Sequence, residues 1–142
     1  MNYEERLIAI LKNDPNILAI LKAVEALNLP DCWICAGILR NKVWDFLHNT
    51  ETPINDIDVI YYDVNDISIV KEQFYETLLH TLIPNLPWSV KNQARMHKKN
   101  NLAPYQSSSD GIRHFPETAT AIGARMINNE IEIIAPHGLS YR

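Results

Sequence analysis

The sequence predicts an α/β (α+β) fold, a mixed β-sheet with helices packed mainly on one face. Segments with the period-2 pattern of strands alternate with segments that have helical spacing of apolar residues. Two further strand-like segments near the end of the chain are joined by Asn128-Asn129, which is typical of a hairpin turn. A chain of 142 residues with 46% hydrophobic content buries a core without disulfides or structural metal. We therefore expect residues 1–142 to form a single domain.

Capping and helix-breaking residues in the first half of the chain predict three helices and two strands. Asp14-Pro15 predicts an N-cap followed by proline at the first helical position, and Gly37 interrupts an apolar strand before a helix begins. The expected elements are a helix at residues 4–12, a helix from Asp14-Pro15 to Asn28-Leu29-Pro30, a strand at Cys32–Ala36, a helix at Leu39–His48 and a strand at Asp56–Tyr62.

The second half of the chain continues the alternation and ends in a hairpin. The helix expected at Asp66–Leu82 has an apolar stripe, which we expect to face the core, formed by Ile67, Val70, Phe74, Leu78 and Leu82. The elements expected after it are a strand at Pro87–Val90, a helix at Asn92–Lys99, a mobile loop at 100–114, a short helix opening at Phe115-Pro116-Glu117, and strands at 124–127 and 131–134.

Net charge and hydropathy exclude several classes of partner. The formal charge of −4 and the pI near 5.7 argue against a protein that coats nucleic acid electrostatically, so a nucleic-acid partner is not expected. The N-terminus is acidic where a signal peptide is basic, and Lys22 and Glu25 interrupt the apolar run that begins at Ile17. We expect a soluble, cytoplasmic protein without a membrane partner.

The two cysteines, Cys32 and Cys35, have the spacing of a thiol redox motif but lie in an apolar segment that is predicted to be a strand. In an extended strand, Cα atoms three residues apart are separated by roughly 10 Å, beyond the ~7 Å limit for a disulfide. We therefore interpret both residues as ordinary buried thiols.

The stretch N-D-I-D-V-I-Y-Y-D places two carboxylates at the start of a strand that otherwise has a buried pattern. Asp56 and Asp58 are two residues apart, so their side chains share one face of the sheet, with Cα atoms about 6.6–7 Å apart. Such a pair suits a magnesium ion, which takes one or two protein carboxylates and completes its shell with water and substrate phosphates. Solvated charge at a strand end is the alternative interpretation.

A second feature strengthens the metal interpretation. The strand before Gly37 opens directly into a helix, so backbone N–H groups around Ile38 to Arg40 are placed to face an anionic phosphate. The order is therefore strand, glycine turn, helix, and then a strand that carries D-x-D.

This order resembles the nucleotidyltransferase superfamily typified by DNA polymerase beta. Over nearly its whole length the chain also resembles a bacterial nucleotidyltransferase-like family of mostly uncharacterised proteins. The resembling stretches are A-G-I-L-R-N-K-V-W-D, N-D-I-D-V-I-Y-Y-D, W-S-V-K-N-Q-A-R-M-H, F-P-E-T-A-T-A-I-G and A-P-H-G-L. The resemblance implies a palm-like fold in which Gly37 opens the phosphate turn and Asp56 with Asp58 holds magnesium. Relative to that family, the chain is short at its C-terminus, and Ile38 stands where a second small residue is usual.

We expect a nucleotide to be bound by residues on both sides of this carboxylate pair. Arg95 is favoured for phosphate because a guanidinium binds it bidentately, whereas a solvated helix face is the alternative for Lys98 and Lys99. The expected nucleotide-binding residues are Gly37, Arg40, Asn41, Ser89, Lys91 and Arg95. His97 and His114 are acid–base candidates, although a lone histidine is more often structural. Trp33, Trp44 and Trp88 are expected in the core.

The leading hypothesis is a magnesium-dependent nucleotidyltransferase that moves a nucleoside monophosphate from an NTP to an unknown acceptor hydroxyl. Its third carboxylate is not evident, because alternation puts Ser89 in the expected place beside Asp58, and Glu132 of the hairpin is the other candidate. The alternative is a non-catalytic nucleotide-binding or regulatory protein that keeps this fold, which Ile38 and the missing carboxylate motivate.

Overall fold

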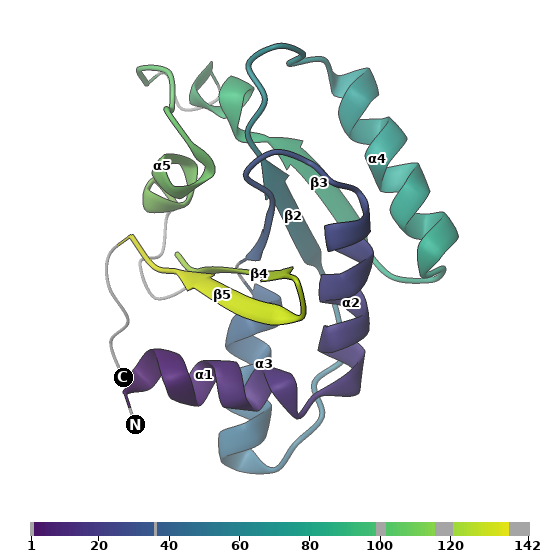
Figure 1. Ribbon diagram of the computed structural model, residues 1–142, viewed down its shortest axis with the longest axis vertical. Helices are drawn as coiled ribbons and strands as arrows, with labels where there is room; N and C mark the ends of the chain where they lie inside the picture. The colour runs from purple at the N-terminus through teal and green to yellow at the C-terminus, as the bar shows by residue number, and fades with distance from the viewer. Residues whose placement is uncertain (1, 36, 99–101, 116–120, 137–142) are drawn as a thin grey trace.

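The computed structural model describes residues 2–35, 37–98, 102–115 and 121–136 and shows the expected alternation of helices and strands (Figure 1). The helices are α1 (Tyr3–Lys12), α2 (Pro15–Ala26), α3 (Gly37–His48), α4 (Ile69–Leu82) and α5 (Ser108–Arg113), together with the 3-10 helix η1 (Gln93–Lys98). The strands are β1 (Trp33–Cys35), β2 (Ile57–Tyr61), β3 (Trp88–Asn92), β4 (Gly123–Ile127) and β5 (Glu130–Ile134).

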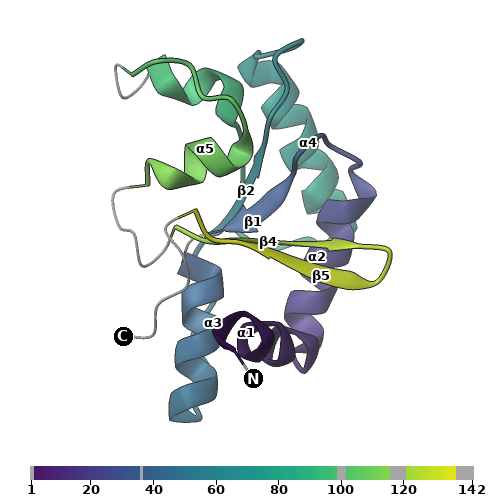
Figure 2. The ribbon, with the colours of Figure 1, turned by 60° about the vertical axis from the view of Figure 1, so that its left-hand side comes forward.

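The strands form a mixed sheet in which β1 is central. Within the described residues the strand order is β3-β2-β1-β4-β5. β1 is antiparallel to both β2 and β4, β2 is parallel to β3, and β4 and β5 form the predicted antiparallel hairpin. Figure 2 shows α2 and α4 on one side of this sheet and α5 on the other. The mixed sheet of the predicted fold class is therefore confirmed.

The larger core lies between the sheet and helices α1 to α4. Ile34, Val59 and Val90 point from three neighbouring strands into this core, and each is at most 1% exposed. The opposite face carries a smaller cluster in which Trp33, Cys35 and Ile60 pack against Ile112 of α5. The expectation that helices pack mainly on one face is thus confirmed, and among the α-helices of the described ranges it is the short α5 that covers part of the other face.

Local capping explains where the helices begin. Asp14 accepts hydrogen bonds from the N–H groups of Asn16 (3.0 Å) and Ile17 (3.1 Å), as the sequence predicts. α3 begins two residues earlier than expected, at Gly37, and α4 begins later, because Ser68 is its N-cap and accepts from the Lys71 N–H. Along the described ranges, no helix has the length and apolar character needed to cross a membrane.

The apolar stripe expected to bury α4 is exposed instead, so that prediction is wrong. Val70 is 74% and Phe74 is 56% exposed, whereas Glu72 is 2% exposed. The reason is the free edge of β3, whose backbone N–H groups need acceptors. Glu72 accepts from the N–H of Asn92 (2.8 Å), and Glu76, one turn later, accepts from the N–H of Val90 (3.2 Å).

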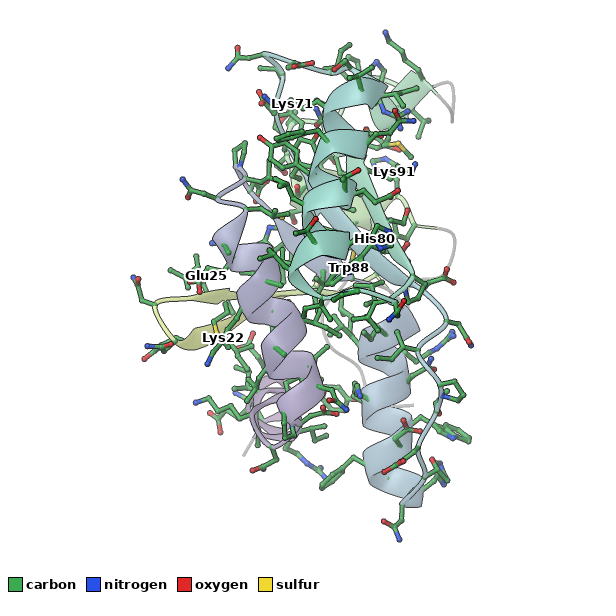
Figure 3. All side chains as sticks on the ribbon, turned by 90° about the vertical axis from the view of Figure 1, so that its right-hand side faces the viewer. Lys22, Glu25, Lys71, His80, Trp88 and Lys91 are labelled. Carbon is green, nitrogen blue, oxygen red and sulfur yellow. The ribbon has the colours of Figure 1, made fainter. Side chains whose placement is uncertain are left out.

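These bonds place α4 alongside β3, as Figure 3 shows, with Lys71 and His80 labelled on the helix and Trp88 and Lys91 on the strand. Glu72 also binds Arg95 through both carboxylate oxygens, at 2.6 Å to Nε and 2.7 Å to Nη2. The inward face of α4 therefore carries Glu72 and Glu76 as well as the fully buried Leu79, because the two glutamates satisfy an edge strand and Glu72 also pairs with a guanidinium.

The segment predicted to be a mobile loop contains a helix, α5, so the expectation for residues 100–114 is wrong. Ser107 caps α5 by accepting from the Asp110 N–H, and the Ser108 hydroxyl donates to the carbonyl of Asp31. Tyr105 and Ile112 are buried. These are long-range contacts, which a local sequence pattern does not reveal. The segment expected as a helix at Asn92–Lys99 forms the 3-10 helix η1, and residues 116 and 117 of the next expected helix lie outside the described ranges.

Replacing Arg95 by alanine should destabilise the fold by about 3–5 kcal/mol, because it leaves the nearly buried Glu72 carboxylate without its cation. Urea unfolding measures the change. The matched control is Glu132→Gln, which removes the ion pair of Glu132 with Arg125, a partly exposed pair with a separation of 3.4 Å. This variant should lower the free energy of unfolding by no more than about 1 kcal/mol. Equal losses in the two variants would contradict the structural role of Arg95.

Candidate functional site

A hollow lies where β1 ends and α3 begins. β1 pairs with β2 so that Cys35 lies opposite Asp58. Gly37, the first residue of α3, follows β1 closely in the chain and lines the same hollow as Asp56, which comes just before β2. The hollow there has a volume of about 120 Å³ and is lined by Gly37, Ile38, Arg40, Asn41, Lys42, Asp45, Thr52, Pro53, Ile54, Asn55 and Asp56. The structure therefore brings Asp56 close to Gly37, Arg40 and Asn41 of α3, which come well before it in the chain.

Gly37 leaves open space at the start of α3. If a Cβ were added there, Nη2 of Arg40 at 3.9 Å would be the one heavy atom within 4 Å among the described residues, apart from the glycine's chain neighbours and its own helix backbone. The first N–H groups of a helix have no partner inside the helix and attract anions. A phosphate oxygen can thus approach this helix end without meeting a side chain at residue 37.

The two aspartates lie at the edge of the hollow and on the strand beside it. Asp56 is exposed just before β2, and Asp58 is half-buried within β2. Burial, together with the charge of Asp56, raises the pKa of Asp58, and the charge of Lys91 partly offsets this. No group of three or more Asp, Glu, His or Cys side chains suited to a metal occurs in the part of the chain that the structure describes. Asp45 also lines the hollow, but it accepts hydrogen bonds from Thr50 and Thr52 and completes no such group with Asp56 and Asp58.

The parallel pairing of β2 with β3 sets what lies beside Asp58. Ser89 pairs with Asp58, and Lys91 pairs with Ile60, so Ser89 and Lys91 share the sheet face of Asp58, as alternation predicts. Glu132 lies on β5, three strands away from β2. Three strand spacings amount to about 14 Å, and Glu132 pairs with Arg125. Glu132 is therefore not a neighbour of Asp58, and the hypothesis that it supplies a third carboxylate is wrong.

Arg95 and the two candidate histidines lie away from the hollow. The Arg95 guanidinium is held bidentately by Glu72 on the side of the sheet covered by α4. His97 and His114 both lie against Tyr105, with the rings of Tyr105 and His114 stacked at a centroid distance of 4.8 Å. None of these three residues lines the hollow. A nucleotide contact by Arg95 remains a prediction.

Sequence reasoning missed the loop that forms one wall of the hollow. Asp45 of α3 accepts hydrogen bonds from the Thr50 hydroxyl (2.9 Å) and from the Thr52 N–H (2.9 Å), so the loop folds back onto the helix. Bonds from Thr52 and Thr50 lower the pKa of Asp45. Lys42 in turn pairs with Asp14 at 2.9 Å and ties α3 to the start of α2. An aspartate followed by two threonines was the available sequence signal.

The remaining sequence expectations concern cysteine and tryptophan. Cys32 and Cys35 are free, buried thiols, as expected, and burial raises the pKa of Cys32 to about 12. Trp33 (4% exposed) and Trp88 (5%) lie in the core, as expected. Trp44 is 58% exposed, so its assignment to the core was wrong. It lies on α3, one turn beyond Asn41.

Comparison with known proteins agrees with this arrangement. A family whose description is "Nucleotidyltransferase" matches residues 22–141. An NMR structure described as revealing a CCA-adding enzyme head domain superposes with a TM-score of 0.80 and 34% sequence identity, over 95% of this chain and 72% of that chain. No curated protein matches the chain significantly. With a family match over most of its length and the fold of a nucleotidyltransferase head domain, the chain belongs to the nucleotidyltransferase family.

Proposed function

We propose that this protein transfers a nucleoside monophosphate from an NTP to the hydroxyl of an acceptor. In this reaction the acceptor hydroxyl loses its proton to solvent and its oxygen bonds to the α-phosphorus. The bond from that phosphorus to the oxygen that bridges it to the β-phosphorus breaks, and pyrophosphate leaves. The observation that carries the proposal is the hollow in which the N-terminus of α3 at Gly37 meets Asp56, with Asp58 on the adjoining strand. A phosphate site and a carboxylate pair thus lie together.

The residues of α3 bind the phosphates in this proposal. The helix N-terminus offers N–H donors and a partial positive charge. Arg40 and Asn41 line the same hollow and offer side-chain donors. Lys91, which faces the same way as Asp58 from β3, adds a cation near the carboxylates, where the triphosphate brings negative charge. Ser89 offers a hydroxyl beside Asp58.

Asp56 and Asp58 fit a magnesium ion by the chemistry of their donor atoms. Asp58 lies within β2 and Asp56 immediately precedes the strand, and magnesium in nucleotide sites takes one or two protein carboxylates and shares substrate phosphates. A bound magnesium ion offsets phosphate charge and lowers the pKa of an attacking hydroxyl. Without a cation the two carboxylates repel each other, which is one reason that the pKa of Asp58 is raised.

A non-catalytic nucleotide-binding protein is the second candidate function. Ile38 is one of the residues that line the hollow, where a smaller residue is usual in the family that the sequence resembles, and it is 4% exposed. The hollow, at about 120 Å³, is also smaller than a typical ligand pocket of ~300–1,000 Å³. A site that holds phosphate but positions it poorly for attack has these properties.

Incubation with each labelled NTP, magnesium and a metabolite extract separates the two candidates. Mass spectrometry should find an acceptor that carries a nucleoside monophosphate, with release of pyrophosphate. The double variant Asp56→Asn/Asp58→Asn should lose at least about a hundredfold in rate, because metal-ion catalysis supplies several kcal/mol. Glu51→Gln, an exposed acid in the nearby loop, is the control and should keep the rate. An NTP-dependent rise in melting temperature without any adduct would favour the binding protein.

Replacing Gly37 by alanine should weaken nucleotide binding and leave the fold intact. The added methyl group enters open space, and replacing glycine by alanine within a helix stabilises the folded protein by up to about 1 kcal/mol. Loss of a hydrogen bond to a charged phosphate costs about 1.5–3 kcal/mol, or roughly 10- to 150-fold in affinity. Calorimetric titration with NTP and magnesium measures the affinity, and urea unfolding measures the stability. Unchanged affinity would argue against phosphate binding at this turn.

Replacing Asp58 by asparagine should raise the melting temperature at pH 7 when no metal is present. Because folding raises the pKa of Asp58, the native state binds the proton more tightly, and stability falls as pH rises from the unfolded value of about 3.9 through the folded one. The gain of the variant should therefore shrink as pH is lowered toward 4. Melting curves of both proteins from pH 4 to 8, with chelator present, test this. The prediction would be contradicted if the melting temperature of the variant, minus that of the parent, were lower at pH 7 than at pH 4.

A further inference from the structure

The exposed aromatic pair on α3 is a surface feature that the phosphate hollow does not account for. Trp44 is 58% exposed, and its ring lies over that of His48 at a centroid distance of 4.0 Å and an interplanar angle of 40°. Exposure of a large flat side chain leaves one ring face to solvent, and aromatic surfaces of this kind bind other planar groups by stacking.

The pair lies on the same face of α3 as the hollow. Gly37, Asn41, Trp44 and His48 follow one another at helical steps of four, three and four residues, which places them in one row along the helix. Gly37 and Asn41 line the hollow. Trp44 comes three residues after Asn41, about 4.5 Å further along the helix axis, and about 10.5 Å beyond Gly37. The aromatic surface therefore continues the row whose first residues line the hollow.

We propose that Trp44, backed by His48, stacks on the nucleobase of a nucleotide whose phosphates occupy the hollow at Gly37. The inference rests on the proposed function, because it assigns the base that accompanies those phosphates. Every base has a flat π-face, so a stacking platform tolerates all four bases, and its removal weakens binding by about 5- to 150-fold. The base belongs either to the NTP or to an oligonucleotide acceptor, and the chemistry of the contact is the same.

The tryptophans of this chain make the contact directly observable. Trp33 and Trp88 are 4% and 5% exposed, so a ligand that stacks at the surface changes mainly the emission of Trp44. Phe46 supplies a matched control, because it is a comparably exposed aromatic residue (63%) on the same helix. Two residues from Trp44 along the helix, it points away from the row, at roughly 200° around the axis.

The experiment titrates the protein with each of the four NTPs, with inorganic tripolyphosphate and with a single-stranded oligonucleotide, all in the presence of magnesium. Emission and calorimetric affinity are recorded for the parent, Trp44→Ala, Trp44→Phe and Phe46→Ala. We expect the NTPs to quench Trp44 and tripolyphosphate to bind without quenching. Trp44→Ala should weaken NTP binding about 5- to 150-fold and leave tripolyphosphate binding unchanged. Trp44→Phe should restore most of the affinity, and Phe46→Ala should have no effect.

The other outcomes separate this inference from the proposed function. If the oligonucleotide alone quenches Trp44 and only its affinity falls in Trp44→Ala, the stacked base belongs to the acceptor and the inference stands. If NTP and oligonucleotide bind the parent and Trp44→Ala equally while tripolyphosphate binds, the stacking inference is overturned and the phosphate site stands. If the NTPs quench Trp44 and bind Trp44→Ala more weakly, but incubation with labelled NTP, magnesium and the metabolite extract yields no adduct, the proposed transfer fails alone. If nothing binds or quenches, both fail.

Discussion

The antiparallel register of β1 against β2 is the constraint on which the candidate site depends. Because Cys35 lies opposite Asp58, and α3 starts two residues after Cys35, the N-terminus of that helix opens beside Asp56. The buried alternate residues of β2, Ile57 and Val59, fix this register, since a slip by one residue would turn them to the face that carries Asp58. The hydrophobic core therefore assembles the polar site by holding two short strands in register.

Charged groups add to apolar contact at the edge of the sheet, where Leu79 of α4 is fully buried in the larger core with Val90 of β3. Glu72 and Glu76 are one helical turn apart on α4, and that spacing of about 6 Å matches the spacing of the N–H groups of Asn92 and Val90 on β3. Arg95 neutralises Glu72, and the side-chain amide of Asn92 donates to the carbonyl oxygens of Asp63 and Asp66 beyond β2. This network keeps β3 parallel to β2, which places Ser89 and Lys91 beside the aspartate pair.

The surroundings of Asp56 and Asp58 indicate why two carboxylates stand at the start of β2. Asp58 is half-buried next to a like charge, an unfavourable arrangement that a basic neighbour only partly offsets. The start of α3, with its unpaired N–H groups, presents positive potential across the same hollow. Carboxylates and helix N-terminus together give a surface that is negative on one side and positive on the other. Such a surface suits a phosphate group that arrives together with a cation, and a solvated strand end does not require it.

The sequence by itself determined the fold class and most of the order of elements, and it singled out the Gly37 turn and the Asp56/Asp58 pair as the candidate site. The periodicity of apolar residues and the capping residues located α1, α2, β2 and the final hairpin, because both signals act locally. They also placed Ser89 and Lys91 on the sheet face of Asp58. Only the tertiary structure decided which face of α4 is buried, that residues 108–113 form a helix, that Arg95 binds Glu72, and that Trp44 stays at the surface. Each of these depends on which residues distant in the chain pack against the segment, such as the edge strand β3 for α4 and the buried carboxylate of Glu72 for Arg95. A local sequence pattern carries no information about such partners.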